Sequence, residues 1–208
     1  MDIRNNFAYH LIVALGSFGL FFALRLSGIE SHRALPAVAF TLLFLTLAIG
    51  PLMRLWKPAV NVLPWNLPWS WRGELGIWFA IVSIAHMLLV FKGAQWDVFE
   101  YLSAMRVGNL VAFIALFWAL ILTATSFGSV IKFIGVSSWR WLHSFAYVVF
   151  YLVGIHVLNH AFFRPGRPSD WLDWSYLVMM LTIVCLQLAA FLITVKEYRK
   201  SLAKKDGD

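Results

Sequence analysis

The sequence predicts an all-α integral membrane protein, a bundle of six membrane-spanning helices. Hydrophobic residues make up 61% of its 208 residues and charged residues only 13%, whereas a soluble domain carries about 25% charged residues. Six windows are long enough to cross a bilayer, which requires about 20 mostly apolar residues. These apolar runs lack the period of two that a membrane β-strand would show, so they favour helices.

We expect the spans, in chain order, near residues 7–26, 35–56, 73–91, 107–125, 139–163 and 173–195. The first is too long for the apolar core of a signal peptide and precedes no small-residue cleavage site, so we expect it to be retained. The short connections leave no room for a soluble domain, which predicts one transmembrane domain over residues 1–208. The single cysteine, Cys185, excludes an intramolecular disulfide and a cysteine metal cluster.

The distribution of basic residues predicts the orientation of the bundle. Eleven Lys and Arg residues fall on the side that holds both termini, and six fall on the other side. By the positive-inside rule, both termini are expected in the cytoplasm. The net charge of +7 therefore reflects topology and contact with lipid headgroups, and it gives no indication of nucleic acid binding.

Five of the six histidines lie within predicted spans, where coordinating side chains are candidate functional groups. The exception, His32, falls in a predicted loop and is expected to be solvated. His86 and His156 each lie about two turns before the outer end of a span, so their depths nearly match. Two imidazoles at one depth on two helices can hold a heme iron from opposite faces. A metal-ion path or a proton relay would also use such residues.

His143 precedes His156 by thirteen residues, which places it roughly 20 Å deeper, where a second heme would fit. In a straight helix these two side chains would point in different directions, unless Gly154 relaxes the helix. The third span has no histidine at the depth of His143. His10, in the first span, could supply the missing ligand or could be an interhelical hydrogen-bonding residue.

Several other polar residues have two interpretations each. His160 lies one turn beyond His156 and is expected to meet water, a heme propionate or a loop. Arg140 could pair with heme propionates or a flavin phosphate, or could anchor the helix at the interface. No carboxylate is expected inside the membrane. The outer carboxylates are expected to be solvated or to steer a partner, and they are Asp97, Glu100, Asp170 and Asp173.

Two segments resemble the ferric reductase-like transmembrane family: RGELGIWFAIVSIAHMLL, residues 72–89, and WRWLHSFAYVVFYLVGIH, residues 139–156. That family has an R-x-x-L-G-rich start to a span bearing one heme histidine. It also has a W-x-x-L-H-x-x-x-Y segment followed by a second histidine about thirteen residues on. The sequence is most similar to the heme-binding membrane subunits of bacterial periplasmic methionine sulfoxide reductase systems, over most of the chain.

This resemblance implies a heme b electron-transport protein of the bacterial inner membrane. It implies heme-iron positions for His86, His143 and His156, and the related subunits also carry a histidine near the position of His10. One heme b is implied, with a second heme, a quinone or FMN as alternatives on the inner side. The implied partner is the catalytic subunit of a periplasmic oxidoreductase, by resemblance a methionine sulfoxide reductase.

NADPH oxidases and ferric reductases share this helical core and carry a cytoplasmic flavin and nicotinamide domain after it. Here a short charged tail follows the last span, and the sequence has no G-x-G-x-x-G phosphate loop. Electrons are therefore expected from membrane quinol or from a separate flavin reductase. Two other function classes remain open: a stand-alone ferric or cupric reductase, and a histidine-based transporter of protons or metal ions.

Overall fold

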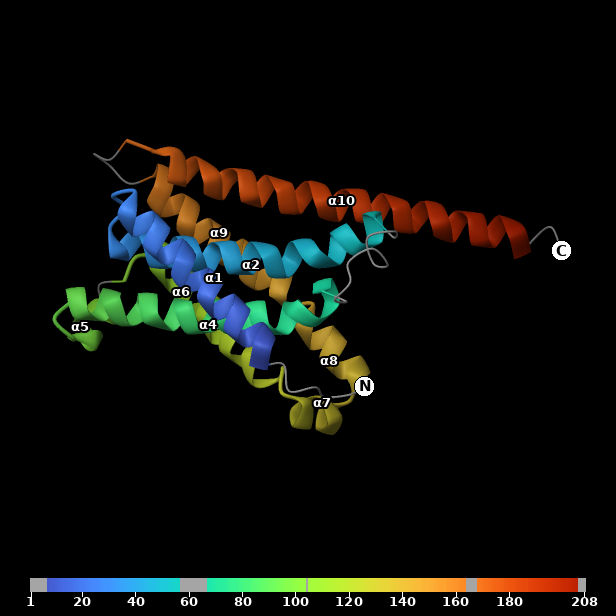
Figure 1. Cartoon of the computed structure of the whole chain (residues 1–208), viewed down its shortest axis with the longest axis horizontal. Helices are drawn as coiled ribbons and strands as arrows, with labels where there is room; N and C mark the ends of the chain where they lie inside the picture. Colours follow the sequence, from blue (N-terminus) through green and yellow to red (C-terminus); the bar gives the residue numbers. More distant parts are fainter. Residues whose placement is uncertain (1–6, 57–66, 104, 164–167, 206–208) are drawn as a thin grey trace.

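The computed structural model describes residues 7–56, 67–103, 105–163 and 168–205. It is 88% helical, and no strand occurs in those residues. Within those described ranges six helices are long and apolar enough to cross a membrane, so the predicted fold class is confirmed. The chain is a multi-pass membrane protein whose surroundings are a lipid bilayer (Figure 1).

The helices agree closely with the predicted spans. The long helices are α1 (Phe7–Leu26), α2 (Ser31–Leu55), α4 (Leu67–Gly93), α6 (Val107–Ala124), α9 (Ala146–Phe162) and α10 (Trp171–Lys205). The short helices are α5 (Val98–Ser103), α7 (Gly128–Ile134) and α8 (Val136–His143). The largest departures are the early start of α4 and the late end of α10, which continues past the predicted apolar window into a basic segment.

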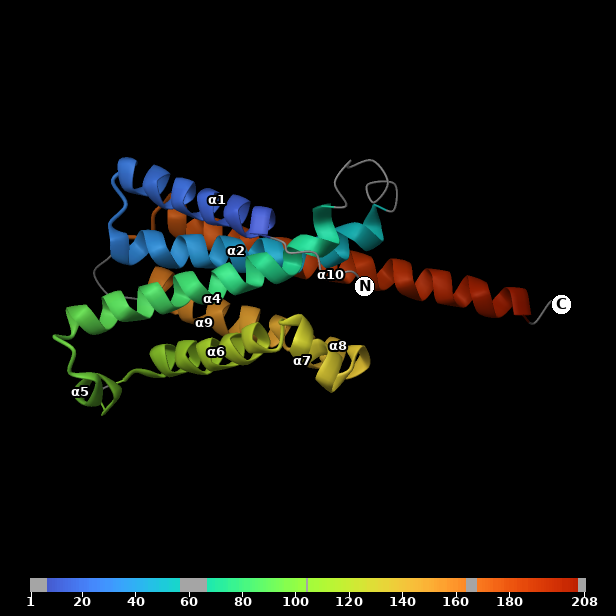
Figure 2. The same ribbon diagram turned by 60° about the horizontal axis from the view of Figure 1, so that its bottom comes forward.

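Successive long helices run antiparallel, so α1 begins and α10 ends at the same end of the bundle (Figures 1 and 2). We call this the terminal end and the opposite one the distal end. The last turns of α10 extend beyond the other helices in both views. The thirty-five residues of α10 correspond to about 50 Å of helix, more than the roughly 30 Å of a bilayer core.

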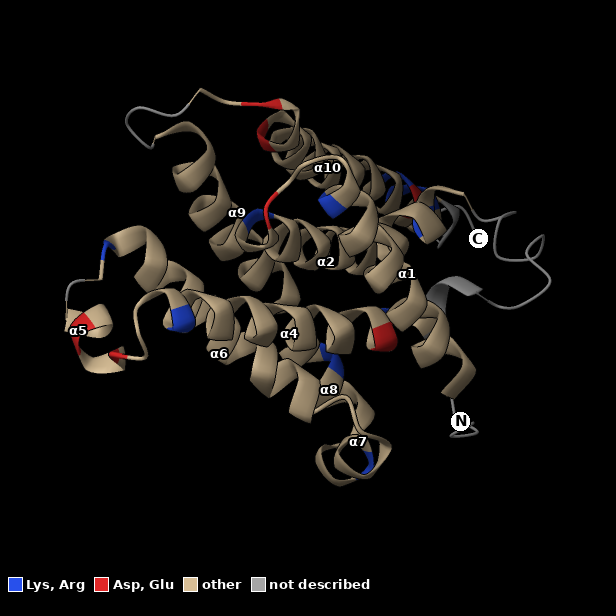
Figure 3. Ribbon diagram, turned by 60° about the vertical axis from the view of Figure 1, so that its left-hand side comes forward, with Lys and Arg blue, Asp and Glu red and all other residues tan. Residues whose placement is uncertain are grey.

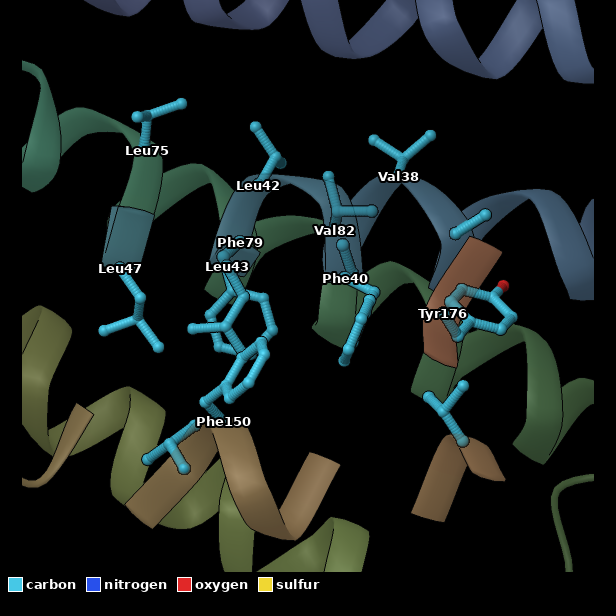
Figure 4. Close-up of a cluster of buried hydrophobic side chains, with 14 of the residues drawn as sticks. Val38, Phe40, Leu42, Leu43, Leu47, Leu75, Phe79, Val82, Phe150 and Tyr176 are labelled. Atoms are coloured by element: carbon cyan, nitrogen blue, oxygen red, sulfur yellow. The ribbon is translucent and has the colours of Figure 1, made fainter. Parts of the chain in front are cut away.

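Helix α2 forms the centre of the bundle. Inside the bundle 61% of its membrane-length window is buried, compared with 17% for α1 and 11% for α10. Phe40 of α2 is fully buried and stacks on Phe150 of α9 at 5.5 Å between ring centroids. Tyr176 of α10 meets the same ring edge-on at 5.4 Å (Figure 4). The outer helices expose apolar side chains, as lipid-facing helices do.

The fifth predicted span is interrupted. Helix α8 ends at His143 and α9 begins at Ala146, whereas one helix was expected over residues 139–163. Between them Phe145 N–H donates to the carbonyl three residues back, at 3.0 Å, so the turn is tighter than an α-helix. Gly154 is not the point of relaxation, because it lies inside regular α9. It is buried against Met180 of α10, where an added Cβ would lie 2.7 Å from the methionine Sδ.

A network of charges joins α2 to α10 at the distal end. Arg33 donates to both carboxylate oxygens of Asp170, at 2.7 and 2.9 Å, and its Nη2 lies 3.4 Å from Oδ1 of Asp173. Asp170 accepts the N–H of Leu172, and Asp173 accepts the N–H of Asp170, so the two carboxylates form a capping box for α10. Asp173 is only 2% exposed, so the expectation that it is solvated is wrong. Glu74, 4% exposed within α4, is a second buried carboxylate that was not expected.

The two ends differ in charge, as Figure 3 shows. At the terminal end the described side chains include seven basic residues, Arg54, Arg72, Lys132, Arg140, Lys196, Arg199 and Lys200. Among the described residues, only Glu74 and Glu197 are acidic there. At the distal end the described basic residues are Arg25, Arg33, Lys92 and Arg106. The described acidic residues there are Glu30, Asp97, Glu100, Asp170 and Asp173. The excess of positive charge therefore lies at the terminal end.

Candidate functional site

A cavity of about 410 Å³ lies in the distal half of the bundle, between α2, α4, α6, α9 and α10. Its wall is mostly apolar and includes Phe40, Phe79 and Phe113. Four histidines also line it, and they are His32, His86, His156 and His160. We call this space the histidine cavity. Its volume falls in the range typical of small-molecule and cofactor sites.

His156 on α9 is held by a backbone carbonyl of α6. Its Nδ1 lies 2.9 Å from the oxygen of Gly108, and because a carbonyl only accepts, Nδ1 carries the proton. The lone pair of the ring is therefore on Nε2. Histidines that bind metals are commonly oriented in this way, through a hydrogen bond from the other ring nitrogen. Gly108 allows the helices to approach, since an added Cβ would lie 3.0 Å from Oδ1 of Asn159.

His86 lines the same cavity from α4. Its Nδ1 is buried and has no hydrogen-bond partner within the described part of the chain. Buried polar atoms without partners are uncommon in folded proteins. The two histidines predicted to share a depth thus line one cavity from different helices. His156 has its lone pair on Nε2, and Nδ1 of His86 has no hydrogen-bond partner among the described residues. These two imidazoles are the residues of the cavity that could hold a metal-bearing cofactor.

His160 belongs to a chain of hydrogen bonds at the distal side of the cavity. Its ring lies 4.7 Å from that of His156, between centroids, and its Nε2 donates to Oδ1 of Asn109 at 2.9 Å. Asn109 Nδ2 in turn donates to the hydroxyl of Tyr101 at 3.1 Å. The structure therefore gives His160 a side-chain partner on α6, which was not among the expected partners. Gly108 and Asn109 were missed, although an asparagine at the start of a span is itself a signal.

Tyr101 is fixed by aromatic neighbours as well as by this hydrogen bond. Its ring meets Phe91 of α4 edge-on at 5.6 Å and lies 6.5 Å from Phe113 of α6. Burial raises the pKa of Tyr101 above its ordinary value. The phenol therefore stays neutral at physiological pH and accepts the hydrogen bond from Asn109 as a hydroxyl.

His32 lies in the first turn of α2, so the loop predicted there is wrong. Its side chain is 59% exposed, as expected, and its Nδ1 lies 3.1 Å from a carboxylate oxygen of Glu30. It lines one side of the histidine cavity together with Arg33. The geometry makes His32 a residue at the cavity surface.

The histidines of the terminal half are arranged differently. His143 ends α8, and its ring lies 4.4 Å from that of Trp139, between centroids, at an angle of 33°. Its Nε2 lies 3.2 Å from Oγ1 of Thr125. His10 lies on α1, which packs against α2 and α4. Within the described residues no hydrogen bond or ring contact joins His10 to His143, and neither lines the histidine cavity. A shared inner site of His10 and His143 therefore stays a prediction.

Two arginines of the terminal half also differ. Arg140 lies exposed on α8. Arg72 of α4 instead reaches between helices, because a Cβ added at Gly50 of α2 would lie 3.4 Å from its Nη1 and 3.9 Å from the hydroxyl of Tyr147 on α9. Arg72 belongs to the R-x-x-L-G segment, and sequence reasoning did not assign it a role.

The described residues include no group of three or more His, Cys, Asp or Glu side chains that could hold a metal ion. Fold and site together define a multi-pass helical membrane protein with a histidine-lined cavity in its distal half. Comparison with known proteins finds no matching family model and no matching curated protein. Its function is therefore inferred from the geometry of the site.

Proposed function

We propose that this protein is a heme b electron-transfer protein of a bacterial inner membrane, with its heme in the histidine cavity. The observation that carries the proposal is that His86 of α4 and His156 of α9 line the same cavity. These two residues would hold the heme iron. Bound heme b supplies one-electron chemistry, and two strong imidazole ligands favour electron transfer over oxygen binding.

The chain contributes orientation and exclusion of water. The carbonyl of Gly108 holds the imidazole of His156 in the tautomer whose lone pair is on Nε2. The apolar wall, including Phe40 and Phe79, keeps water from the iron ligands. Such a shell strengthens local electrostatics and sets the reduction potential.

The excess of basic residues supports a cytoplasmic terminal end and an outward-facing distal end. Electrons would then enter from membrane quinol or a flavin reductase at the terminal end. They would leave from the histidine cavity to an acceptor outside the cytoplasm. By the sequence resemblance, the acceptor is a partner oxidoreductase of the methionine sulfoxide reductase type.

The absorption spectrum of the purified protein, expressed with sufficient heme, tests this proposal. We expect a Soret band and a sharp α band on reduction with dithionite. His86→Ala and His156→Ala should each abolish the six-coordinate spectrum. His32→Ala is the matched control, because His32 lines the same cavity but is exposed and paired with Glu30. A wild-type protein without heme, or a full six-coordinate spectrum in His156→Ala, would contradict the proposal.

A further inference from the structure

A second cavity of about 1000 Å³ lies at the distal end, beside the histidine cavity. It is bounded by α5, by the ends of α4 and α9 and by the start of α6. Asp97, Glu100, Arg106 and Asn159 are among its lining residues, so its wall is far more polar than that of the histidine cavity. We call it the polar cavity.

Three residues line both cavities, and they are Tyr101, Asn109 and His160. They are also the three residues joined by consecutive hydrogen bonds, of 3.1 and 2.9 Å. Each comes from a different helix, α5, α6 or α9. A continuous row of hydrogen-bonded side chains therefore separates the polar cavity from the histidine cavity.

The α5 side of this row is the least firmly attached. Helix α5 has six residues and none of them is buried. It follows Gln95 and Trp96, whose φ angles are +54° and +63°, a conformation that costs energy in residues other than glycine. Tyr101 holds α5 through its hydrogen bond to Asn109 and its ring contacts. Segments with so few buried contacts open at low free energy.

We propose that the Tyr101–Asn109–His160 row is a wall that keeps water and small solutes of the polar cavity out of the histidine cavity. Asn109 is the central positioning residue, since it bonds to both of the others and acts through them. The consequence for electron transfer rests on the proposed function: an acceptor in the polar cavity receives electrons across this wall, without coordinating the iron.

Thiol labelling of the full chain tests the wall without requiring heme. The parent carries Cys185→Ser, which removes the exposed native thiol, and Ser83→Cys, which places a thiol in the histidine cavity. The probe is methanethiosulfonate ethylammonium. Asn109→Ala should raise the labelling rate above the parent about tenfold, since losing a hydrogen bond of ordinary net strength shifts an opening equilibrium by about that factor.

The matched control is Asn159→Ala, the same substitution at a residue that lines only the polar cavity. Its labelling rate should equal that of the parent. Tyr101→Phe keeps the ring but removes the hydroxyl that accepts from Asn109, so the labelling rate should increase by a smaller factor. This variant also tests the wall if Asn109→Ala fails to fold. A rate unchanged in both Asn109→Ala and Tyr101→Phe, or raised equally by Asn159→Ala, overturns the proposal.

In the heme-loaded protein, water admitted through the wall stabilises the more highly charged oxidised iron. At a fixed applied potential, Asn109→Ala should therefore increase the ratio of oxidised to reduced heme about threefold, and Asn159→Ala should not change it. Absence of heme would contradict the proposed function but would not affect the labelling test of the wall. If Asn109→Ala binds heme but its labelling rate and reduction potential are unchanged, the wall is contradicted and the proposed function is not.

Discussion

The distal and terminal halves of the bundle both contain intramembrane histidines, but different ring nitrogens of these histidines have hydrogen-bond partners. In the distal half, His156 donates from Nδ1 to a backbone carbonyl, so its lone pair is on Nε2. In the terminal half, Nε2 of His143 lies 3.2 Å from Oγ1 of Thr125, a hydroxyl that also lies 2.9 and 3.1 Å from two backbone carbonyl oxygens. The nitrogen engaged by a hydrogen-bond partner is thus Nε2 in His143 and Nδ1 in His156. Depth in the membrane identifies candidate histidines, but the hydrogen-bond partner decides which can coordinate.

The largest expected effect separates the two halves by heme content. His156→Ala should lose the heme completely, whereas His143→Ala should keep the wild-type ratio of heme to protein. The reason is that His143 bonds to Thr125 and does not line the histidine cavity. The ratio can be measured from the heme absorbance and the protein concentration of the purified variants.

Thr125→Val is the control for this comparison, because it removes the hydrogen bond of His143 and leaves the ring in place. It should also keep the heme. A heme content that falls by half in His143→Ala would show that the terminal half holds a second heme.

The next largest effect concerns the charges that join α2 to α10 at the distal end. Arg33→Met leaves the carboxylate of Asp173, 2% exposed, without its cation. Removing one member of a buried pair typically costs about 3–5 kcal/mol. Because Arg33 is itself partly exposed, we expect a loss of about 2–3 kcal/mol in the free energy of unfolding, measured in detergent micelles.

Lys92→Met is the matched control, since Lys92 is an exposed cation at the same end of the bundle. It should change the free energy of unfolding by less than about 0.5 kcal/mol. Asp173→Asn should recover part of the loss in the Arg33→Met background. Equal stability of Arg33→Met and wild type would show that Asp173 does not depend on this pair.

These two halves also show what the sequence could predict. The bilayer fixes the length of an apolar helix, so the spans were predictable, and α1 begins and ends at the expected residues. His86 and His156 could be matched by depth alone. The burial of Asp173 could not be predicted, because its partner Arg33 lies 140 residues away in the sequence. The break between α8 and α9 also has no local signal, since Ser144 and Phe145 are ordinary helical residues.

A smaller effect is expected where α9 packs on α10. Gly154→Leu should destabilise the protein by about 1–3 kcal/mol, because the new side chain collides with Met180 and overpacking of this kind forces helices apart. Thermal unfolding in micelles measures it. Gly16→Leu is the control, since nothing lies within 4 Å of a Cβ added there. If Met180→Ala does not restore stability to Gly154→Leu, the collision is not the cause.

The smallest effect is the pH dependence of the distal charges. The hydrogen bond from Arg33 lowers the pKa of Asp170 from 3.8 to about 2. The folded protein therefore binds this proton less readily than the unfolded chain, so the pair stabilises the fold fully above about pH 4. That contribution is lost as the pH falls toward 2. The unfolding temperature should decrease over this window in the wild type and change less in Asp170→Asn.

Asp170→Asn and Arg33→Met should flatten the same part of this pH profile, because each removes one side of a single interaction. Since Asp170 is partly exposed, the change should be small beside the whole loss of stability in Arg33→Met, which also removes the cation beside buried Asp173. A steep acid decrease that persists in both variants would place the responsible carboxylate elsewhere, with buried Glu74 of the terminal half as the next to substitute. The acid sensitivity would then belong to the terminal half.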